Sequence, residues 1–489
     1  MGEEKNSKIS RRAALSSLAK TAIGVVVAGV VGGVIGYGVG SSTVPKEVTT
    51  TVREVVTSTV KTTEYATVTV TAAPITVTAP TTVAAPTIVV NPQRFKGVTI
   101  DWWDGLGGGD GYVMDMLLQD WHKQYADNIK VIRVMQGEWS EVYSKIAAAY
   151  KAGTGIPDVC LCHSTEHGLF SGTAFQPIDD LVAEAGFKKE HFVEFAWNSG
   201  FWKGKQYGMP WDVHLYSLYI NRGMANKYGI RIPELGEFKT PWDLIEWLRE
   251  ARQKLPPNLY PYNLMTGIIG WAWEWWTIVK GNPLTKEDLY TPDFRVDSRD
   301  GIESFEWYYT LGKEKLAKAH TFEETAAALG GDCLSWLHGP WMQATFDKIE
   351  GFDYVVVPVF GQGSGYAVWG ESHMIYLTRA NGDERTRAAW EVIKWLYKPE
   401  NNGRWGAIAG HIPALKAGQE YPDYKNNPKR LIWAKQVELG FKHPPVHPDQ
   451  QKWLNMMATY AGECFEGKRK PEDAASAAQA DLEELAKYY

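Results

Sequence analysis

The chain has 489 residues, a formal net charge of −6 and four cysteines, and 44% of its residues are hydrophobic. This length suits two or three domains, and the composition is that of a globular protein. The charges are spread along the chain without a basic block, which argues against nucleic acid as a partner, and four cysteines are too few for a disulfide scaffold.

Residues 1–40 have the pattern of an export signal or a membrane anchor. Four basic residues lie among the first twelve, and an uncharged apolar run follows from Ala22 to Val39. This run is near the lower length limit of a membrane span. SRRAAL, at Ser10–Leu15, is similar to a twin-arginine export motif, although Ala14 stands where that motif prefers Phe. An ordinary secretory signal is the alternative interpretation.

Residues 41–92 are dominated by Thr, Val, Ala and Pro, and aromatic residues almost disappear. Such a tract cannot bury enough apolar surface to fold alone, so it predicts an extended stalk. The expected order is signal or anchor, stalk and then a globular body at residues 93–489. This order predicts that the body lies at the extracytoplasmic face of the cell membrane, either anchored by the N-terminal helix or secreted after signal cleavage.

The body begins with alternating strand and helix patterns. The predicted elements are a strand at Val98–Ile100, a helix at Tyr112–Tyr125, a strand at Ile129–Met135, a helix ended by Gly153 and a strand in PDVCLC at Pro157–Cys162. Alternation of this kind is typical of an α/β fold with a mainly parallel sheet. Cys160 and Cys162 lie in an apolar run, which favours buried free thiols over metal ligands.

Later segments continue the α/β pattern. The stretch Lys205–Asn221 resembles a strand, and Thr240 and Pro241 have the types expected at the cap and first turn of a helix. An amphipathic helix follows at Arg387–Glu400, with its end marked by Pro399. Cys333 and Cys464 remain open as a disulfide pair.

Seven segments of the body, in order, resemble the sugar-binding group of extracellular solute-binding proteins of ABC transporters, the group that includes maltose-binding protein (family 1). The resemblance covers nearly all of residues 95–489. The segments are WHKQYADNIKVIRV, WSEVYSKIAAAYKAGTGIPDV, FSGTAFQPIDDLV, GKQYGMPWDVHLYSLYINRGMANKYGIRIPE, TPWDLIEWLREARQKL, LGGDCLSWLHGPW and AAWEVIKWLYKPENNGRWGAIAGHIPA.

The resemblance implies a two-lobed, periplasmic-binding-protein-like α/β fold (type II) with a ligand cleft between the lobes. Three inter-lobe crossings are expected near Met209–His214, Gly365–Ser372 and Ala409–Ala414. Lobe 1 would comprise about residues 95–209 and 370–410, and lobe 2 about residues 213–367 and 414–489. Clefts between domains are favoured ligand sites, and hinge closure is a common response to a ligand.

The resemblance also implies a function without catalysis. The protein would capture a carbohydrate by lobe closure and deliver it to permease subunits in the membrane, while a separate subunit hydrolyses ATP. No catalytic residue, cofactor or metal site is predicted, because no nucleotide-binding, hydrolase or metalloprotease motif is present, and His163, His167, His214 and His373 lack short metal-ligand spacing apart from His163 and His167.

The chain contains 22 tryptophans, and four of them lie in GWAWEWWTIV at Gly270–Val279. A sugar site combines aromatic rings, which stack on C–H faces, with polar side chains that bind hydroxyls. Residues of both kinds occur where the family places ligand contacts. The predicted ligand-binding residues are Trp102, Trp103, Asp104, His163, Glu166, Trp211, Asp212, Trp271, Trp273, Trp341, Trp369 and Glu371.

Helical spacing assigns other tryptophans to the core, namely Trp121, Trp247, Trp307, Trp390 and Trp395, and packing is also expected for Trp275 and Trp276. Two functional alternatives remain open beside carbohydrate capture. One is a binding protein of the same fold for a peptide, a polyamine or a metal. The other is a glycoside hydrolase, which would use a pair of carboxylates with aromatic subsites. A surface or structural role, suggested only by the stalk, does not explain the clustered tryptophans.

Overall fold

The computed structural model describes residues 85–266, 268–321, 331–361, 363–379 and 382–488. The predicted signal or anchor, and the predicted stalk up to residue 84, lie outside these ranges. Within the described ranges, no helix is both long and apolar enough to cross a bilayer. The chain just before the body already contacts it, because Lys394 Nζ donates to the Val89 carbonyl and the Asn91 backbone N–H donates to Glu391.

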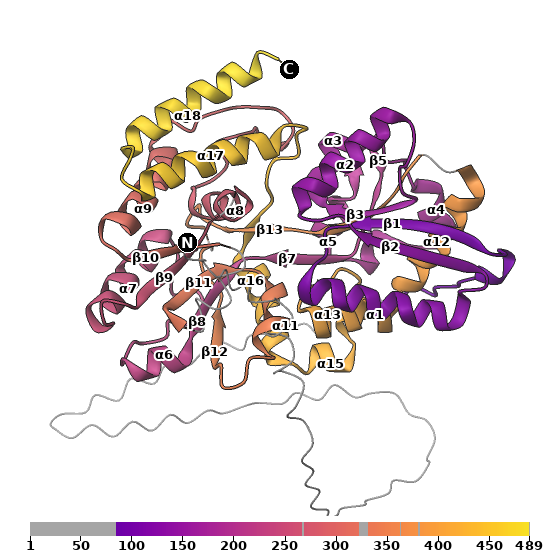
Figure 1. Cartoon of the computed structure of the whole chain (residues 1–489), viewed down its shortest axis with the longest axis horizontal. Helices are drawn as coiled ribbons and strands as arrows, with labels where there is room; N and C mark the ends of the chain where they lie inside the picture. Colours follow the sequence, from indigo (N-terminus) through magenta and orange to yellow (C-terminus); the bar gives the residue numbers. More distant parts are fainter. Residues whose placement is uncertain (1–84, 267, 322–330, 362, 380–381, 489) are drawn as a thin grey trace, which may run out of the picture. The chain divides into compact units, whose positions relative to one another are not determined.

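One lobe is built on a five-stranded sheet of order β2-β1-β3-β14-β6, and Figure 1 shows its strands β1, β2 and β3 side by side. The strands β1, β2 and β3 are parallel, and β14 and β6 complete the sheet in antiparallel pairs. Every residue of β3 is buried, as expected for a strand covered on both faces. The strands are β1 (Val98–Asp104), β2 (Ile129–Met135), β3 (Val159–His163), β6 (Gly208–Pro210) and β14 (His373–Leu377).

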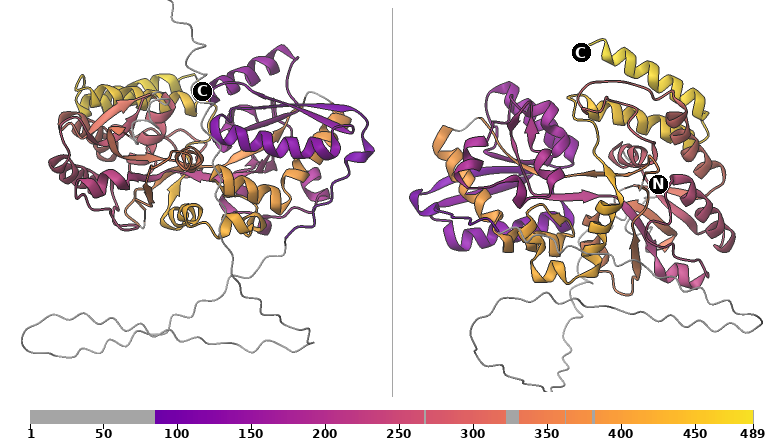
Figure 2. Two further views of the ribbon diagram at one scale, coloured as in Figure 1. Left: turned by 60° about the horizontal axis from the view of Figure 1, so that its bottom comes forward. Right: turned by 180° about the vertical axis from the view of Figure 1, so that it is seen from behind.

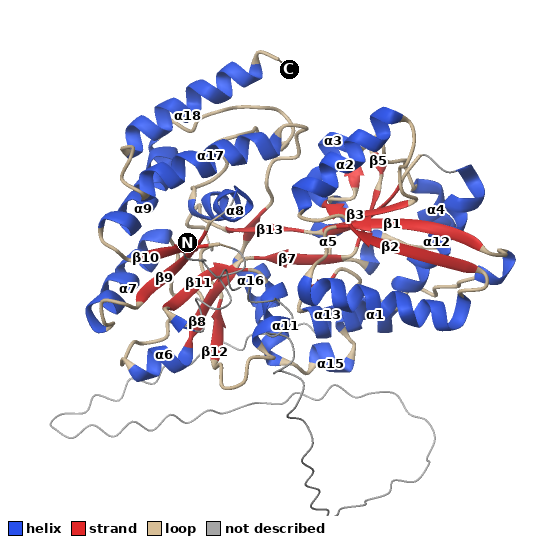
Figure 3. Ribbon diagram, in the orientation of Figure 1, coloured by secondary structure: helices blue, strands red, loops and turns tan. Residues whose placement is uncertain are grey.

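Helices flank this sheet (Figure 3). Gly153 ends α2 in a left-handed conformation (φ 68°), which explains why glycine stands there. Pro399 separates two helices and occupies the first turn of the second, where its missing N–H costs nothing. The helices are α1 (Gly108–Tyr125), α2 (Trp139–Ala152), α12 (Gly382–Leu396) and α13 (Pro399–Ala409). The predicted strand at 129–135 and both predicted early helices are therefore confirmed, with α1 starting earlier than its apolar pattern indicated.

The other lobe contains a five-stranded sheet of order β10-β9-β11-β8-β12. Its strands are β8 (Ser217–Asn221), β9 (Tyr260–Met265), β10 (Ala317–His320), β11 (Cys333–His338) and β12 (Tyr354–Val357), and its main helices are α7 (Pro241–Lys254), α8 (Ile268–Ile278), α9 (Arg299–Lys313), α17 (Gln450–Phe465) and α18 (Pro471–Ala486). Thr240 caps α7 and forms a capping box with Asp243, as its residue type predicts. Figure 2 shows the yellow C-terminal helices α17 and α18 against this lobe, where they contact α8 and α9.

A smaller sheet of order β15-β7-β13-β16 connects the two lobes. Its strands are β7 (Asp212–Leu215), β13 (Val368–Glu371), β15 (Ile412–Pro413) and β16 (Phe441–Lys442). In sequence, β7 lies between β6 of the first sheet and β8 of the second, and β13 returns from β12 to β14 (Figure 1). The predicted crossing segments all contribute a strand to this connecting sheet.

The remaining short elements link these layers. Helices α14 and α15 pack on α13, while α16 contacts β7, β12 and β15. The short elements are η1 (Pro92–Arg94), η2 (Ser164–Glu166), α3 (His167–Phe170), α4 (Asp179–Glu184), η3 (Lys189–His191), α5 (Glu194–Asn198), β4 (Phe201–Trp202), β5 (Lys205–Gln206), α6 (Arg222–Lys227), η4 (Pro340–Met342), α11 (Gln343–Phe346), α14 (Lys416–Gln419), α15 (Pro422–Lys425) and α16 (Pro428–Leu439). The residue limits of the lobes stay a prediction.

Tryptophans form much of the core. All of the tryptophans assigned to packing from their helical spacing, and Trp275 and Trp276 of α8, are buried. The cysteines Cys160 and Cys162 are buried free thiols, as predicted. Cys333 and Cys464 are also free and buried, so the disulfide that the sequence left open is not formed.

Candidate functional site

Three tryptophans meet beside the connecting sheet. Trp273 of α8 stacks on Trp369 of β13, with ring centroids 4.3 Å apart and an angle of 18° between the ring planes. Trp341 of η4 stands edge-on to both rings, at 6.3 Å from Trp273 and 6.1 Å from Trp369. Trp369 is fully buried, whereas Trp273 and Trp341 are half-buried. The stacked Trp273–Trp369 pair and the edge-on Trp341 ring form one aromatic group.

The glycine before Trp341 lets its ring fold back on the chain. A Cβ at Gly339 would lie 1.9 Å from Cζ3 of Trp341. The φ of Gly339 is −94°, which any residue can adopt, so the glycine is required by the close approach of the ring and not by the backbone conformation. The sequence Gly339-Pro340-Trp341 therefore sets the position of one ring of the site.

Four histidines adjoin these tryptophans. His163 ends β3, His214 lies in β7, His373 begins β14 and His411 precedes β15. The His163 ring centroid is 5.6 Å from that of Trp273 and 5.0 Å from that of His373. The ring of Trp341 stacks on His411 at 6.2 Å and lies 5.9 Å from His214. Imidazoles from the first lobe and from the connecting strands thus face tryptophans from the second lobe.

Three further aromatic side chains complete the group. Trp139, at the start of α2, stacks on His373 at 5.3 Å, and Tyr216 and His338 lie 6.2 Å and 4.8 Å from Trp341. We refer to the whole set as the aromatic–histidine cluster, which comprises Trp139, His163, His214, Tyr216, Trp273, His338, Trp341, Trp369, His373 and His411.

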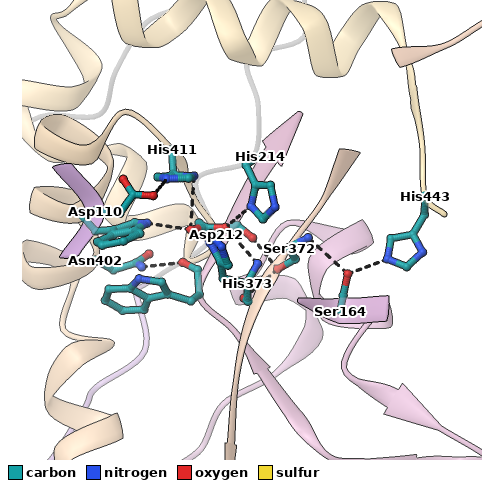
Figure 4. A network of polar contacts seen from close by, with 11 residues as sticks. Asp110, Ser164, Asp212, His214, Ser372, His373, Asn402, His411 and His443 are labelled. Atoms are coloured by element: carbon teal, nitrogen blue, oxygen red, sulfur yellow. Dashed lines mark hydrogen bonds and ion pairs between the residues drawn. The ribbon is translucent and has the colours of Figure 1, made fainter. Parts of the chain in front are cut away.

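Asp212 of β7 lies fully buried at the centre of the histidines (Figure 4). Its carboxylate is 2.9 Å from Nδ1 of His214, 2.9 Å from Nδ1 of His373 and 3.5 Å from Nδ1 of His411. The indole N–H of Trp405 and the backbone N–H of His373 donate to the same carboxylate. Burial alone would raise the pKa of Asp212, but the imidazoles around it hold the pKa well below its usual value.

The histidines differ in charge. Burial, with neighbouring imidazoles, lowers the pKa of His163 well below its usual value and lowers that of His214 to about 3. Burial also lowers the pKa of His338. Burial acts in the same direction on His411, but Asp110 and Asp212 outweigh it and raise the pKa of His411. At neutral pH the rings of His163, His214 and His338 are therefore uncharged and can both donate and accept hydrogen bonds.

Glu166 and Glu371 form an acidic pair beside the cluster. Thr165 Oγ1 and Trp369 Nε1 donate to Glu371 at 3.2 Å and 3.1 Å. Burial raises the pKa of each carboxyl group to about 8, and the charge of Glu371 contributes to the shift at Glu166. Both groups are therefore largely protonated at neutral pH, so each combines a donor with acceptors.

Some of the predicted site residues lie in or beside the aromatic–histidine cluster, and the others lie outside it. His163, Trp273, Trp341 and Trp369 belong to the aromatic–histidine cluster, and Asp212, Glu166 and Glu371 adjoin it. Trp102 is fully buried and donates to Asp104, whose carboxylate is paired with Arg133 at 2.6 Å. These last contacts hold β1 to β2.

The structure keeps three other predicted residues out of the cluster. Trp271, on another face of α8, stacks on Tyr308 at 5.4 Å and lies near Phe465. Trp211 is fully buried against Tyr397 and Trp405. Trp103 is half-buried and packs with the core around Tyr143 and Phe170. Because α8 is a helix, Trp271 and Trp273 face different directions, whereas an extended segment would have aligned them.

Sequence reasoning missed several members of the cluster. Trp139, Tyr216, His214, His338, His373 and His411 were not among the predicted site residues, and His214 and His373 were named individually only when metal binding was weighed. Trp139 lies a short turn after the end of β2. Other site residues were predicted because they lie close to strand ends, so the same rule could have identified Trp139. His411 lies in the third predicted crossing, so its position in sequence was a usable signal.

The two lobes are in contact around the cluster. Ser164 Oγ lies 2.6 Å from Nε2 of His443, in the segment between β16 and α17. Glu166 forms a hydrogen bond with Gln450 at the start of α17. A Cβ at Gly168 would lie 2.7 Å from the carbonyl carbon of His447. His163, Asp212, Glu371, His373 and His411 are all buried. These contacts are those of a closed arrangement of the two lobes.

Comparison with known proteins connects this arrangement to a family. Residues 117–431, more than half of the chain, match the family of bacterial extracellular solute-binding proteins. Among curated proteins, the sn-glycerol-3-phosphate-binding periplasmic protein UgpB of Shigella dysenteriae is 22% identical over 356 residues, which cover 68% of this chain and 78% of that protein. UgpB of Pectobacterium atrosepticum is 20% identical over 372 residues, which cover 71% and 80% of the respective chains.

Solved structures show the same fold. The GacH receptor of Streptomyces glaucescens, solved unliganded and with acarbose, superposes with a TM-score of 0.67 at 16% identity over 80% of this chain and 99% of that one. UgpB of Mycobacterium tuberculosis, solved with glycerophosphocholine, superposes with a TM-score of 0.68 at 16% identity, over 80% of this chain and 98% of that one. The maltodextrin-binding MalE domain of Bdellovibrio bacteriovorus, bound to maltotriose, superposes with a TM-score of 0.66 at 20% identity, over 80% of this chain and 100% of that one. The two-lobed α/β fold predicted from the sequence is confirmed.

Proposed function

This chain belongs to the bacterial extracellular solute-binding proteins, and from that premise we propose that it captures a carbohydrate as the substrate-binding component of an ABC transporter. The aromatic–histidine cluster carries the proposal. Its stacked and edge-on tryptophans match the apolar C–H faces of sugar rings, and its imidazole and carboxyl groups match the hydroxyl edges.

The chemistry of the cluster favours an uncharged ligand over a phosphate ester. The groups around Trp273, Trp341 and Trp369 are aromatic rings, the uncharged imidazoles of His163, His214 and His338, and the two carboxyl groups of Glu166 and Glu371, while His411 beside Trp341 is paired with Asp110. Asp212 is ionised, and its negative charge would repel a phosphate. The relatives named for sn-glycerol 3-phosphate and glycerophosphocholine bind anionic or zwitterionic ligands, whereas those solved with acarbose and maltotriose hold sugars. We assign this chain to the second ligand class.

Lobe closure is the proposed mechanism of capture. The tryptophans Trp273 and Trp341 belong to the second lobe, and His163 and Trp139 belong to the first, so their contacts break when the lobes separate. A sugar would enter the open form, and closure would place its ring faces against the tryptophans while excluding water. The closed form would then present the sugar to permease subunits, and a separate ATPase subunit would drive transport. The N-terminal segment would keep the body at the extracytoplasmic face of the membrane.

Titration of tryptophan fluorescence tests this proposal. The purified protein is titrated with maltotriose, longer maltodextrins and other oligosaccharides, and in parallel with sn-glycerol 3-phosphate and glycerophosphocholine. A saturable change with an intact sugar is expected, and Trp341→Ala should lower its affinity roughly 5- to 30-fold, which corresponds to about 1–2 kcal/mol for one lost aromatic contact. Recovered sugar is checked for cleavage.

Trp242→Ala is the matched control, because Trp242 is also half-buried but lies in the first turn of α7, outside the cluster. It should leave sugar affinity unchanged. Binding of the phosphate esters alone would overturn the assignment to sugars. Cleavage of the sugar would replace capture with hydrolysis.

A further inference from the structure

We propose that Asp212, His214, His373 and His411 form a binding site for a divalent transition metal, with Zn²⁺ as the best fit, at the joint between the two lobes. This inference does not depend on the identity of the sugar. All four side chains are buried, and one ligand atom of each lies within 4.8 Å of the others. Figure 4 shows the three imidazoles arranged around the Asp212 carboxylate.

The distances suit a tetrahedral metal. Zinc bonds to nitrogen and oxygen of about 2.0–2.1 Å place neighbouring ligand atoms roughly 3.3 Å apart in a tetrahedron. The carboxylate of Asp212 is separated from the three Nδ1 atoms by 2.9, 2.9 and 3.5 Å. The two 2.9 Å contacts are hydrogen bonds, so a metal would replace the protons shared by Asp212 with His214 and His373. The side chains need move only a little, because the backbones of their strands are already paired.

His411 supplies an observation that points to a bound cation. Its Nε2 lies 2.9 Å from Oδ2 of Asp110, and a carboxylate can only accept, so Nε2 carries the proton. Nδ1 of His411 faces the Asp212 carboxylate at 3.5 Å without a hydrogen-bond partner. A metal ion placed between Nδ1 and the carboxylate would bond to both.

Asp110 is also the kind of partner that metal-binding histidines have. A ligating imidazole commonly donates its second N–H to a carboxylate, which fixes the ring orientation and strengthens the ligand. Asp212 has similar support from the N–H groups of Trp405 and His373. Hydrogen bonds to surrounding residues therefore fix the orientation of His411 and Asp212.

Charge balance supports the same conclusion. Two carboxylates, Asp110 and Asp212, adjoin His411 in a buried region. The nearby cation Arg430 is engaged elsewhere, since its guanidinium contacts Asp347 at 3.4 Å and Gln343. A divalent ion bound to Asp212 and His411 would place positive charge beside both carboxyl groups, and buried negative charge is costly when it is unpaired.

The ligand types select a transition metal. Three imidazoles and one carboxylate suit zinc, copper, nickel or cobalt, whereas calcium and magnesium prefer oxygen ligands. A second group within the described residues, His320, Asp332 and Cys333, is less suitable. There Lys318 Nζ already lies 2.5 Å from Asp332, so an ammonium group occupies the place of a metal ion.

The position of the site gives it a mechanical role. Asp212 and His214 lie on β7, His373 begins β14 just after β13, and His411 precedes β15. The ligands therefore come from segments at all three inter-lobe connections, and one ion would tie them together. Trp341 stacks on His411, so the ion would also orient one ring of the sugar site.

Metal analysis of the full-length protein tests the proposal. The protein is stripped with EDTA, dialysed and titrated with Zn²⁺ by calorimetry, and with Co²⁺ while the visible absorption is recorded. One ion per chain is expected, with a dissociation constant below about 1 µM, as for structural zinc sites. Cobalt should give the strong visible bands of four-coordinate geometry.

Variants identify the ligands. His411→Gln and His373→Gln should each weaken zinc binding at least 100-fold, while His443→Gln should not, because His443 is a comparable histidine outside the ligand set. Circular dichroism confirms that each variant is folded. If a ligand variant does not fold, X-ray absorption of the wild-type zinc form decides the question, since three imidazoles give a distinct scattering pattern.

Several results would overturn the proposal. They are zinc binding weaker than about 1 µM, binding that His411→Gln and His373→Gln leave intact, binding lost instead in His320→Gln, or a spectrum without imidazole ligands. Sugar binding is measured separately with metal-free and zinc-loaded protein. The carbohydrate proposal is therefore tested independently of the metal site.

Discussion

Replacing Gly168 by alanine should hinder lobe closure without disturbing either lobe. Gly168 lies in the short helix α3 of the first lobe and faces the backbone of His447 and Pro448. That segment belongs with the second lobe, because Val446 N–H donates to the Leu289 carbonyl and His447 stacks on Trp453 of α17. The substitution therefore adds one methyl group to an inter-lobe contact.

The size of the effect follows from the geometry. A Cβ at this position would lie 2.7 Å from the His447 carbonyl carbon and 2.9 Å from the Pro448 nitrogen, whereas ordinary contacts begin at 3.4 Å. The neighbouring backbone must retreat by the difference between 3.4 and 2.7 Å, and backbone cannot rotate away as a side chain can. Overpacking of this kind costs about 1–3 kcal/mol. The strain exists only in the closed form, so ligand affinity should fall roughly 5- to 150-fold.

The assay combines calorimetric titration with small-angle X-ray scattering, using the tightest-binding sugar of the panel. The wild type should become more compact when the sugar is added, and Gly168→Ala should do so less completely. Gly462→Ala is the matched control, because Gly462 is also helical but a Cβ there meets no atom within 4 Å. Both variants should unfold at wild-type temperature or slightly above, since alanine favours a helix by up to about 1 kcal/mol.

Equal affinity and equal compaction in Gly168→Ala and Gly462→Ala would contradict this prediction. That result would mean that the contact of α3 with the segment before α17 is not formed in the ligand-bound state.

Three further predictions concern pH, helix capping and metal removal. Burial raises the pKa of Glu166 and Glu371 from 4.5 to about 8. The folded state thus binds more protons than the unfolded state between pH 4.5 and 8, and the free energy of unfolding should fall as pH rises through that window. Glu371→Gln should flatten this fall in urea titrations at pH 5 and 8.5, and an unchanged slope would contradict the assignment. Thr240→Ala removes the acceptor of the Asp243 N–H and should lower the free energy of unfolding by about 1 kcal/mol, unless the capping box is absent in solution. Excess zinc at a hundredfold its dissociation constant should add about 3 kcal/mol and raise Tm relative to EDTA-treated protein, and an unaltered Tm would count against the site.

Much of the secondary structure follows from local sequence. The spacing of apolar residues predicts α1 and α2, Gly153 ends α2, and Thr240 and Pro241 begin α7. These signals are local because caps, turns and helix periodicity depend on residues only a few positions apart. The same periodicity assigned Trp121 and Trp307 to the core, where both are fully buried.

Part of the candidate site was also accessible from the sequence. His163, Trp341 and Trp369 lie at strand ends or at a crossing, and the structure brings them into one cluster. The direction of Trp273 relative to Trp271 could not be predicted without knowing whether Gly270–Val279 is helical or extended. An extended segment would place both side chains on one face, whereas a helix separates them. In the helix α8, Trp273 stacks on Trp369 of the cluster and Trp271 stacks on Tyr308, on another face.

Only the tertiary structure determined the remaining relationships. Asp104 and Asp212 are both buried carboxylates next to a tryptophan in sequence, yet Asp104 pairs with Arg133 and Asp212 with three histidines. His214, His373 and His411 are too far apart along the chain to show metal-ligand spacing. They meet because β7 pairs with β13 and β15 in one sheet and β14, which begins at His373, follows β13 in the chain. Strand pairing depends on long-range contacts that no local pattern encodes.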